Sequence, residues 1–271
     1  MGGRTQEHRT LPLGGLPVIA ATRAALAEML VEDRRARRGA GLPPKLLTSA
    51  NGHVLALCDR DPAFRAAVAA ADVIDADGMS LVIASRWLAD APLPERVATT
   101  DFFHDAARVG ERGGMSFFLL GATATVNAEA LARVREAYPG LRVEGRDGYF
   151  GPGEEVAVIE EIRRARPDVV WVGLGVPREQ AFALRLREAL AEDGVTWIKT
   201  CGGLFDFLSG ARIRAPRFMQ DIGFEWLWRT AMEPRRLFKR YAVTNLRAIG
   251  VMAKHGRRTR REGRAVMREE R

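Results

Sequence analysis

The chain has 271 residues, of which 47% are hydrophobic and 28% charged, and its formal net charge is +8. This composition excludes an intrinsically disordered chain and is sufficient for a large buried core. The sequence has no uninterrupted apolar run of about 18 to 20 residues, and its polar start lacks the apolar core of a secretion signal, so we expect a cytoplasmic globular protein without a membrane span.

The N-terminal part contains one clear helical pattern. We expect residues 1–14 to form a loose leader and residues 16–20 a short apolar run. Residues 22–38 combine apolar side chains at helical spacing, an N-cap candidate in Thr22 and a basic end, which together predict a helix. The glycines and prolines of residues 39–44 end this pattern. We therefore treat residues 1–44 as an N-terminal leader and helix.

Strand and helix patterns then alternate as far as residue 210. Apolar runs predict strands at residues 45–49, 73–74, 115–120, 141–144, 168–174 and 195–200. Helical spacing predicts helices at residues 54–71 with a break at Asp61-Pro62, and at 81–89, 101–112, 126–138, 154–166 and 178–191. Such repeats predict a Rossmann-like α/β fold, in which helices cover both faces of a largely parallel sheet. We expect this core to span residues 45–210.

The composition changes after Gly210. Residues 211–271 contain 17 Lys and Arg but only 6 Asp and Glu, a net charge of +11, whereas residues 1–210 carry a net charge of −3. Residues 214–251 are helix-like and mix aromatic side chains with arginines. This pattern suits a membrane interface, but the aromatic side chains could equally pack on the α/β core. We expect a C-terminal helical appendage over residues 211–255 and a disordered basic tail over 256–271.

Cysteine and histidine give no sign of a metal site. Cys58 and Cys201 are far apart in apolar surroundings, which favours two buried free thiols over a disulfide. The four histidines are scattered, and none forms the paired Cys/His spacing of a structural zinc site. We therefore expect no structural zinc.

The segment from Asp72 to Met79 holds the main candidate for a catalytic residue. A short apolar run ends in Asp77 and Gly78, and a helical pattern follows. Ligands of open α/β sheets bind where strands end and helices begin, so Asp77 is placed for chemistry, and our hypothesis is that it acts as a general base. It could instead only cap the following helix. Together with Asp75 it also spells D-x-D, a spacing by which many glycosyltransferases hold a divalent cation.

Three glycine-bearing turns follow predicted strands, at residues 121–123, 173–177 and 202–206. Small residues let a phosphate approach the backbone, and free N–H groups at the start of a helix attract an anion. None of the three matches a dinucleotide or triphosphate fingerprint, and each could be an ordinary turn.

Twelve ordered motifs give the chain a family resemblance. They are Thr48-Ser-Ala-Asn51, Asp77-Gly78, Pro94-Glu95-Arg96-Val97, Leu119-Leu120-Gly121, Tyr138-Pro139, Gly148-Tyr149-Phe150, Pro167-Asp168, Gly173-Leu-Gly175-Val-Pro177, Gly202-Gly203-Leu-Phe-Asp206, Arg214-Ala-Pro216, Glu225-Trp226-Leu-Trp228-Arg229 and Glu233-Pro234-Arg235-Arg236. Because these motifs occur in this order over residues 46–241, the chain resembles the WecG/TagA/CpsF family of bacterial glycosyltransferases.

The resemblance implies an inverting transferase that moves a sugar from a UDP-sugar to a polyprenyl-diphosphate-linked sugar. Such a reaction serves the biosynthesis of a surface polysaccharide or a teichoic acid linkage unit. It takes place at the inner face of the cell membrane, where the protein would be peripheral. The resemblance implies no metal and no other cofactor. The donor sugar, N-acetylmannosamine or another hexose, and the oligomeric state, a homo-oligomer among the alternatives, remain open.

The resemblance also implies roles for individual residues. Asp77 matches the family's general base, and Thr48 and Asn51 match its catalytic threonine segment. The spacing here is T-x-x-N, so Thr48 or Ser49 could be the functional match. Where the family commonly reads P-K-Q-E, this chain reads Pro177-Arg-Glu-Gln180, which leaves Glu179 or Gln180 for the sugar-binding role.

In the appendage, Arg214, Arg229 and Arg236 match the arginines that close over the diphosphate in such enzymes. Lys239 stands where the resemblance implies a further arginine. The full set of expected substrate-binding residues is Arg96, Gly121, Thr123, Gly173, Gly175, Gln180, Gly202, Gly203, Asp206, Arg214, Arg229 and Arg236.

Two other functions compete with this interpretation. One is a metal-dependent nucleotide-sugar transferase that uses Asp75 and Asp77 as ligands. The other is a nucleic-acid-binding protein, suggested by the basic tail and a pI of about 10.2. The first 210 residues are slightly acidic and contain no nucleic-acid module, so the tail would support only nonspecific, salt-sensitive binding.

Overall fold

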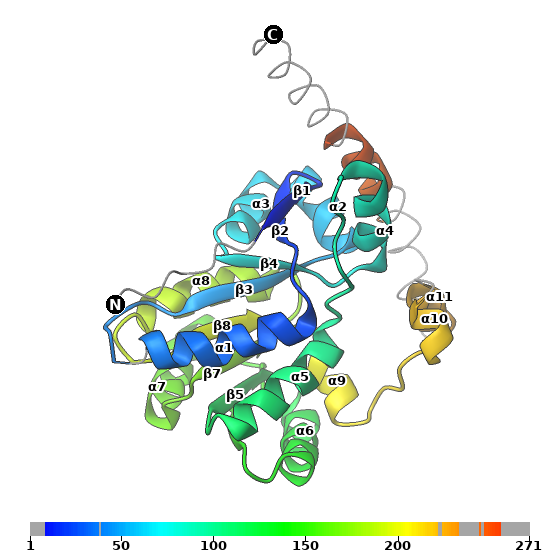
Figure 1. Cartoon of the computed structure of the whole chain (residues 1–271). Coiled ribbons are helices and arrows are strands. Elements are labelled where there is room, and N and C mark those ends of the chain that lie inside the picture. Colours follow the sequence, from blue (N-terminus) through cyan, green and yellow to red (C-terminus); the bar gives the residue numbers. More distant parts are fainter. Residues whose placement is uncertain (1–8, 38, 222–223, 233–243, 245–246, 256–271) are drawn as a thin grey trace.

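The structure, a computed structural model, describes residues 9–37, 39–221, 224–232, 244 and 247–255. Within these residues eight strands form one sheet in the order β1-β2-β4-β3-β8-β7-β5-β6 (Figure 1). The strands β1 to β8 are Thr10–Leu13, Leu16–Ile19, Lys45–Ala50, Val73–Ala76, Ser116–Gly121, Arg142–Arg146, Val169–Gly173 and Trp197–Thr200. The β1–β2 pair is antiparallel, and the other neighbouring pairs are parallel, which confirms the predicted fold class.

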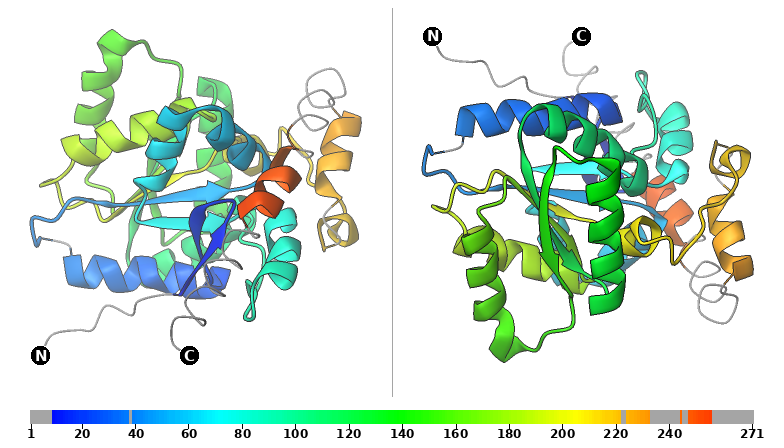
Figure 2. Two further views of the ribbon diagram at one scale, coloured as in Figure 1. Left: turned by 90° about the horizontal axis from the view of Figure 1, so that it is seen from above. Right: turned by 90° about the horizontal axis from the view of Figure 1, so that it is seen from below.

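Helices cover both faces of the sheet, as the views from above and from below show (Figure 2). One face packs against α1 (Arg23–Arg37), α5 (Thr99–Arg112), α6 (Ala124–Ala137) and α9 (Leu204–Leu208). The other packs against α7 (Glu155–Ala165) and α8 (Arg178–Ala189), with the short 3-10 helix η1 (Pro152–Glu154) before α7. A third cluster joins β1, β2 and β4 to α2 (Gly52–Arg60), α3 (Pro62–Ala69) and α4 (Met79–Leu88).

Strand β7 shows why the apolar runs in the sequence are continuous. Val169 and Trp171 point into the cluster on one face, whereas Val170 and Val172 point into the cluster on the other. Since successive side chains of a strand alternate between faces, a strand covered on both sides needs an apolar residue at almost every position.

The expectation of a loose leader over residues 1–14 is wrong for residues 10–13, which form β1. Leu11 and Leu13 alternate into the core, and the strand pairs with β2 through a tight turn. Gly14 and Gly15 make this turn with φ values of +60° and +75°, which favour glycine over residues with a side chain. Residues 1–8 lie outside the described residues.

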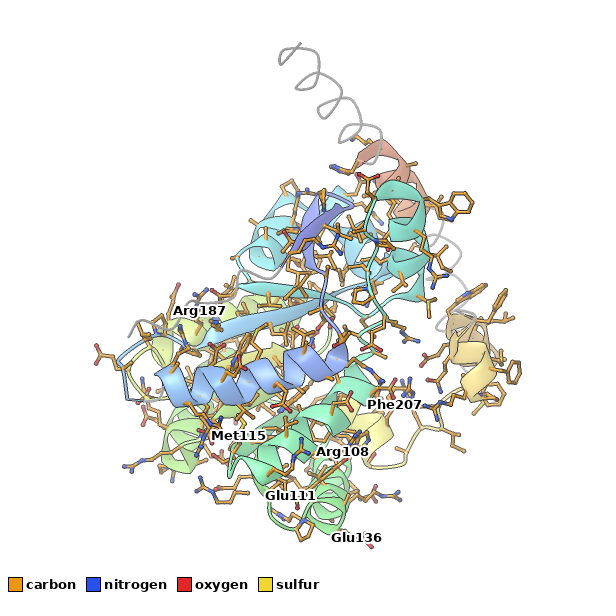
Figure 3. All side chains as sticks on the ribbon, viewed as in Figure 1. Arg108, Glu111, Met115, Glu136, Arg187 and Phe207 are labelled. Atoms are coloured by element: carbon orange, nitrogen blue, oxygen red, sulfur yellow. The ribbon has the colours of Figure 1, made fainter. Side chains whose placement is uncertain are left out.

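The appendage begins with two short helices, α10 (Arg217–Asp221) and α11 (Glu225–Met232), and residues 247–255 are also helical. The prediction of a helix-like segment over residues 214–251 is therefore confirmed only for these parts, because residues 233–243 and most of the predicted tail lie outside the description. Side chains project from α10 and α11 away from the sheet domain (Figure 3). Phe218, Phe224 and Leu227 are exposed, so packing on the α/β core does not account for them.

The structure also bears on two absences expected from the sequence. Among the described residues, no helix combines the length and apolar character needed to cross a membrane. Cys58 and Cys201 are buried free thiols, as predicted. Burial raises the pKa of the Cys58 thiol to about 11.

Candidate active site

A cavity of about 1150 Å³ opens at the carboxyl ends of four neighbouring strands, β4, β3, β8 and β7. The chain runs from β3 to β4 on one side of the sheet centre, and β8 later returns to the other side of β3. This reversal of strand order leaves a crevice beyond the strand ends, which is the usual ligand site of open α/β sheets. The cavity lining includes residues that directly follow these strands, namely Asn51, Asp77, Leu174 and Cys201.

Asp77 extends from the end of β4 into this cavity, and 25% of its side chain is exposed. Its Oδ1 accepts a hydrogen bond of 3.3 Å from the backbone N–H of Thr99, at the start of α5. The Arg96 guanidinium lies 3.7 Å from the same oxygen and donates 2.6 Å to the Asp77 carbonyl oxygen. The residue that caps α4 is Gly78, without a side-chain bond, so the alternative that Asp77 merely caps this helix is wrong.

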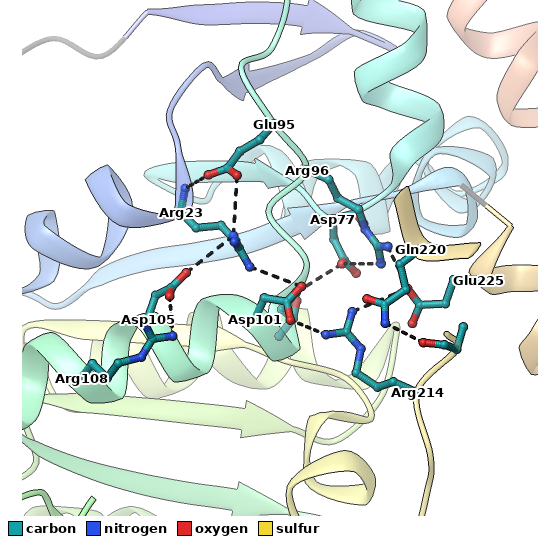
Figure 4. Close-up of polar contacts among 12 residues, drawn as sticks. Arg23, Asp77, Glu95, Arg96, Asp101, Asp105, Arg108, Arg214, Gln220 and Glu225 are labelled. Atoms are coloured by element: carbon teal, nitrogen blue, oxygen red, sulfur yellow. Dashed lines mark hydrogen bonds and ion pairs between the residues drawn. The ribbon is translucent and has the colours of Figure 1, made fainter. Parts of the chain in front are cut away.

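Two cavity-lining arginines meet an acidic residue of the appendage (Figure 4). Arg96 donates 2.7 Å to the Glu225 carboxylate, and the Arg214 guanidinium lies 3.8 Å from the same Glu225 oxygen. Arg214 also hydrogen-bonds Asp101 on α5. The appendage is thus tied to the core beside Asp77. A phosphate that binds here competes with Asp101 and Glu225 for these guanidinium groups.

The other predicted arginines of the appendage cannot be placed. The backbone of Arg229 belongs to α11, but its side chain and the whole of Arg236 and Lys239 lie outside the described residues. Arg178 and Arg212 line the cavity and were not predicted as binding residues. Arg178 directly follows the glycine-bearing turn at residues 173–177, which was the available signal, and Arg212 stands two positions after Gly210.

The predicted threonine segment divides between the core and the cavity. Thr48 is buried and its hydroxyl lies 2.8 Å from the Thr200 hydroxyl, and it does not line the cavity. Ser49 does line the cavity, because adjacent residues of a strand face opposite ways. Asn51 also lines it, but its side-chain oxygen caps α2 by accepting 3.0 Å from the Val54 N–H.

A buried ion pair lies under the cavity floor. The Lys199 ammonium on β8 donates 2.7 Å to Asp75 on β4 and 2.6 Å to the Ser49 hydroxyl on β3. The side chains of Lys199 and Asp75 are 1% and 0% exposed. Burial raises the pKa of the Asp75 carboxyl, and the Lys199 ammonium opposes that rise. Asp75 is therefore bound to an internal cation and does not share the cavity with Asp77, which argues against the D-x-D metal pair.

The three glycine-bearing turns contribute unequally to the lining of the cavity. Gly173, Gly175, Gly202, Gly203 and Asp206 line the cavity, and Asp206 pairs with Arg212 at 3.2 Å. Gly121 and Thr123 do not line it, although Ala122 between them does.

Gly121 and Thr123 have clear structural tasks instead. A Cβ at Gly121 would lie 2.4 Å from the Gly173 carbonyl oxygen, so the close contact of β5 and β7 requires glycine there. The Thr123 hydroxyl caps α6 by accepting 3.3 Å from the Val126 N–H.

Glu179 connects two of the glycine turns. Its buried Oε2 accepts hydrogen bonds from the N–H groups of Gly175 at 3.1 Å and Gly202 at 3.0 Å. These two N–H groups are therefore occupied by a protein carboxylate, contrary to the prediction that they are free for a phosphate. Gln180 lines the cavity too, and its amide donates 3.4 Å to the other Glu179 oxygen. Burial raises the pKa of the Glu179 carboxyl to about 7, against the lowering effect of Gly202, Gly175 and Lys199.

The raised pKa of Glu179 predicts a pH-dependent stability. Between its ordinary pKa of 4.5 and about 7, Glu179 keeps its proton only in the folded protein, so the free energy of unfolding should fall as the pH rises through this window. The difference between the two pKa values corresponds to a decrease of about 3 kcal/mol in the free energy of unfolding. Glu179→Gln keeps an oxygen for both N–H groups but cannot titrate. Urea denaturation at several pH values should show this fall in the wild type relative to Glu179→Gln; parallel curves for the two proteins would contradict it.

Comparison with known proteins identifies the family. The chain matches the model of the glycosyl transferase WecG/TagA/CpsF family over residues 11–262. It is 33% identical over 178 residues to the N-acetylglucosaminyldiphosphoundecaprenol N-acetyl-beta-D-mannosaminyltransferase of Bacillus spizizenii, in an alignment that covers 65% of this chain and 67% of the relative. Since the family model spans nearly the whole chain, the protein is an enzyme and belongs to the WecG/TagA/CpsF family of glycosyltransferases.

Proposed function

We propose that the protein transfers a sugar, N-acetylmannosamine or another hexose, from a UDP-sugar to a polyprenyl-diphosphate-linked sugar in surface polysaccharide biosynthesis. The relative in Bacillus spizizenii is named for transfer of N-acetylmannosamine to N-acetylglucosaminyl-diphosphoundecaprenol, and it supports the substrate class. The observation that carries the proposal is the Asp77 carboxylate, which faces a cavity lined by arginines at the switch point of the sheet.

In the proposed reaction the acceptor hydroxyl attacks the anomeric carbon of the donor from the face opposite UDP. Asp77 takes the hydroxyl proton as the new carbon–oxygen bond forms, and the bond to the UDP oxygen breaks with its electron pair on the leaving diphosphate. The departing charge needs preorganised cations. Arg214 and Arg96 line the cavity beside Asp77 and are candidates for this role, and Arg229 and Arg236 are proposed from the family motifs.

We also propose that the reaction needs no metal ion. Asp75 is held by Lys199, and the described residues contain no group of three or more His, Cys, Asp or Glu arranged to hold a metal ion. Arginines can compensate the diphosphate charge in place of a cation. Turnover is therefore expected to be unchanged when UDP release is measured with excess EDTA. A strict requirement for added Mg²⁺ or Mn²⁺ would contradict this proposal.

The proposed acceptor is a membrane lipid, so we expect the reaction to take place at a membrane surface. Exposed Phe218 and Leu227 lie on helices α10 and α11, and exposed Phe224 directly precedes α11; arginines stand nearby at positions 217 and 229 of the sequence. Aromatic and aliphatic side chains at headgroup depth, combined with cations that meet anionic lipids, favour peripheral binding to the cytoplasmic face.

The reaction itself is tested with purified protein, a panel of UDP-sugars and a lipid-linked sugar diphosphate acceptor. We expect UDP release that requires both substrates and is fastest with one donor of the panel. The glycosylated lipid should appear in equal amount by mass spectrometry. If no donor gives acceptor-dependent UDP release, the proposed function is wrong.

A further inference from the structure

One wall of the cavity is apolar and begins beside the candidate base. Helix α4 starts at Met79, two residues after Asp77, and Met79 and Ile83 both line the cavity. Residues four apart lie on the same side of a helix, so Trp87 continues this row. The row extends about 12 Å along the helix at 1.5 Å per residue. Ile83 is 43% and Trp87 75% exposed, so the row runs from the cavity to the outer surface.

The opposite wall comes from the far end of the chain. The helix of residues 247–255, orange-red in the figures, lies beside α4 (Figures 1 and 2). Ala248 and Met252 are buried in the core cluster that includes the α4 residues Leu81 and Val82. Arg247 pairs with Asp59 on α2 at 2.7 Å, which further fixes this helix to the core.

Apolar side chains of three segments therefore face one space. Ile249 is 60% exposed and lines the cavity, as do Met252 and, from α11, Trp226. We refer to the cavity wall formed by Met79, Ile83, Trp226, Ile249 and Met252 as the α4 groove. Helix α4 and the helix of residues 247–255 pack against the same core cluster, so these two walls of the groove are preformed, which lowers the entropy lost when a ligand binds.

We propose that the α4 groove binds the first isoprene units of the acceptor's polyprenyl tail. This inference rests on the proposed function. The groove and Asp77 line the same cavity. When the sugar hydroxyl of the acceptor reaches Asp77, the hydrocarbon tail attached to that headgroup therefore starts inside this cavity, next to the groove. A bilayer surface cannot enter a cavity, whereas a single apolar chain can lie along a helix. The exposed Trp87 at the outer end marks where the tail leaves the protein.

Binding measurements with two acceptor analogues test this proposal. Both carry the same sugar diphosphate; one has a tail of a few isoprene units, short enough to dissolve without detergent, and the other only an ethyl group. The wild type should bind the isoprenoid analogue at least about tenfold more tightly, since each buried methylene contributes about 0.8 kcal/mol. The double variant Ile83→Ser/Ile249→Ser should lose most of this preference and bind the ethyl analogue as the wild type does.

Val156→Ser is a matched control, because Val156 is exposed on α7 and does not line the cavity. It should keep the wild-type preference. An equal affinity of the wild type for both analogues, or an undiminished preference in the double variant, would overturn the groove assignment.

Two further readouts separate this proposal from its alternatives. If the double variant instead loses binding to acceptor-free vesicles while it keeps its preference for the isoprenoid analogue, the α4 groove contacts the bilayer and not the tail. Turnover is measured separately with each analogue and a UDP-sugar. Tail-dependent binding without any turnover would contradict the proposed function and support the groove assignment. Turnover without tail-dependent binding would support the proposed function and contradict the groove assignment.

Discussion

The Asp77→Asn variant is expected to lose about 10²- to 10⁴-fold in kcat, the usual contribution of a general base. Asparagine has nearly the same shape, and its amide oxygen can still accept the hydrogen bond from the Thr99 N–H. It cannot take the proton of the acceptor hydroxyl. Donor binding should change little, because Arg96 keeps its contacts with the Asp77 backbone oxygen and with Glu225 and loses only the 3.7 Å ion pair with the replaced carboxylate.

The measurement is initial-rate UDP release at saturating donor and acceptor, together with the KM for the donor. Asp90→Asn serves as the matched control, because Asp90 is exposed just beyond the far end of α4 and does not line the cavity. It should retain wild-type activity. A folded Asp77→Asn protein with kcat within a few-fold of the wild type would show that Asp77 is not the base.

The Lys199→Met variant is expected to lose about 3 to 5 kcal/mol of unfolding free energy, because it leaves a buried carboxyl group without its cation. Lys199 and Asp75 are both almost fully buried, and water cannot replace the lost partner. The Ser49 hydroxyl loses its donor as well. Part of the loss should disappear at acidic pH, where Asp75 can take up a proton and become neutral.

Urea denaturation of Lys199→Met and of the double variant Asp75→Leu/Lys199→Met measures this effect. The double variant should recover most of the lost stability, since well-packed apolar residues often replace a buried ion pair without cost. If Lys199→Met alone changes the free energy of unfolding by less than about 1 kcal/mol, the pair is not the stabilising contact inferred from the structure.

The sequence was sufficient for the fold class and for the position of Asp77. Continuous apolar runs such as Val169–Gly173 are typical of strands buried on both faces, and their alternation with helices predicts the parallel sheet. An acid and a glycine between a strand and a helix then place Asp77 at the ligand-binding edge. Strand β1 was missed because its four residues are too short for a periodic pattern to stand out against the turn that follows.

The contacts under the site were beyond sequence reasoning. Lys199 and Asp75 are 124 positions apart, and their pairing depends on β8 and β4 lying on either side of β3. A charged residue inside each of two apolar runs was the available signal. The hydrogen bonds by which Glu179 joins two turns were missed for a similar reason, because its partners Gly175 and Gly202 are far apart in the sequence. The choice between Thr48 and Ser49 depends on a shift of one residue, which in a strand reverses the direction of the side chain.

The helix of residues 247–255 has a consequence for the nascent chain. Its Ala248 and Met252 cover part of the core cluster built by β1, β2 and β4, residues made far earlier in translation. Until the ribosome has released this helix, the apolar side chains beneath it stay uncovered and one wall of the cavity is missing. The cavity is therefore incomplete until this helix has been synthesised, and a chain terminated before it would expose an apolar surface to chaperones and proteases.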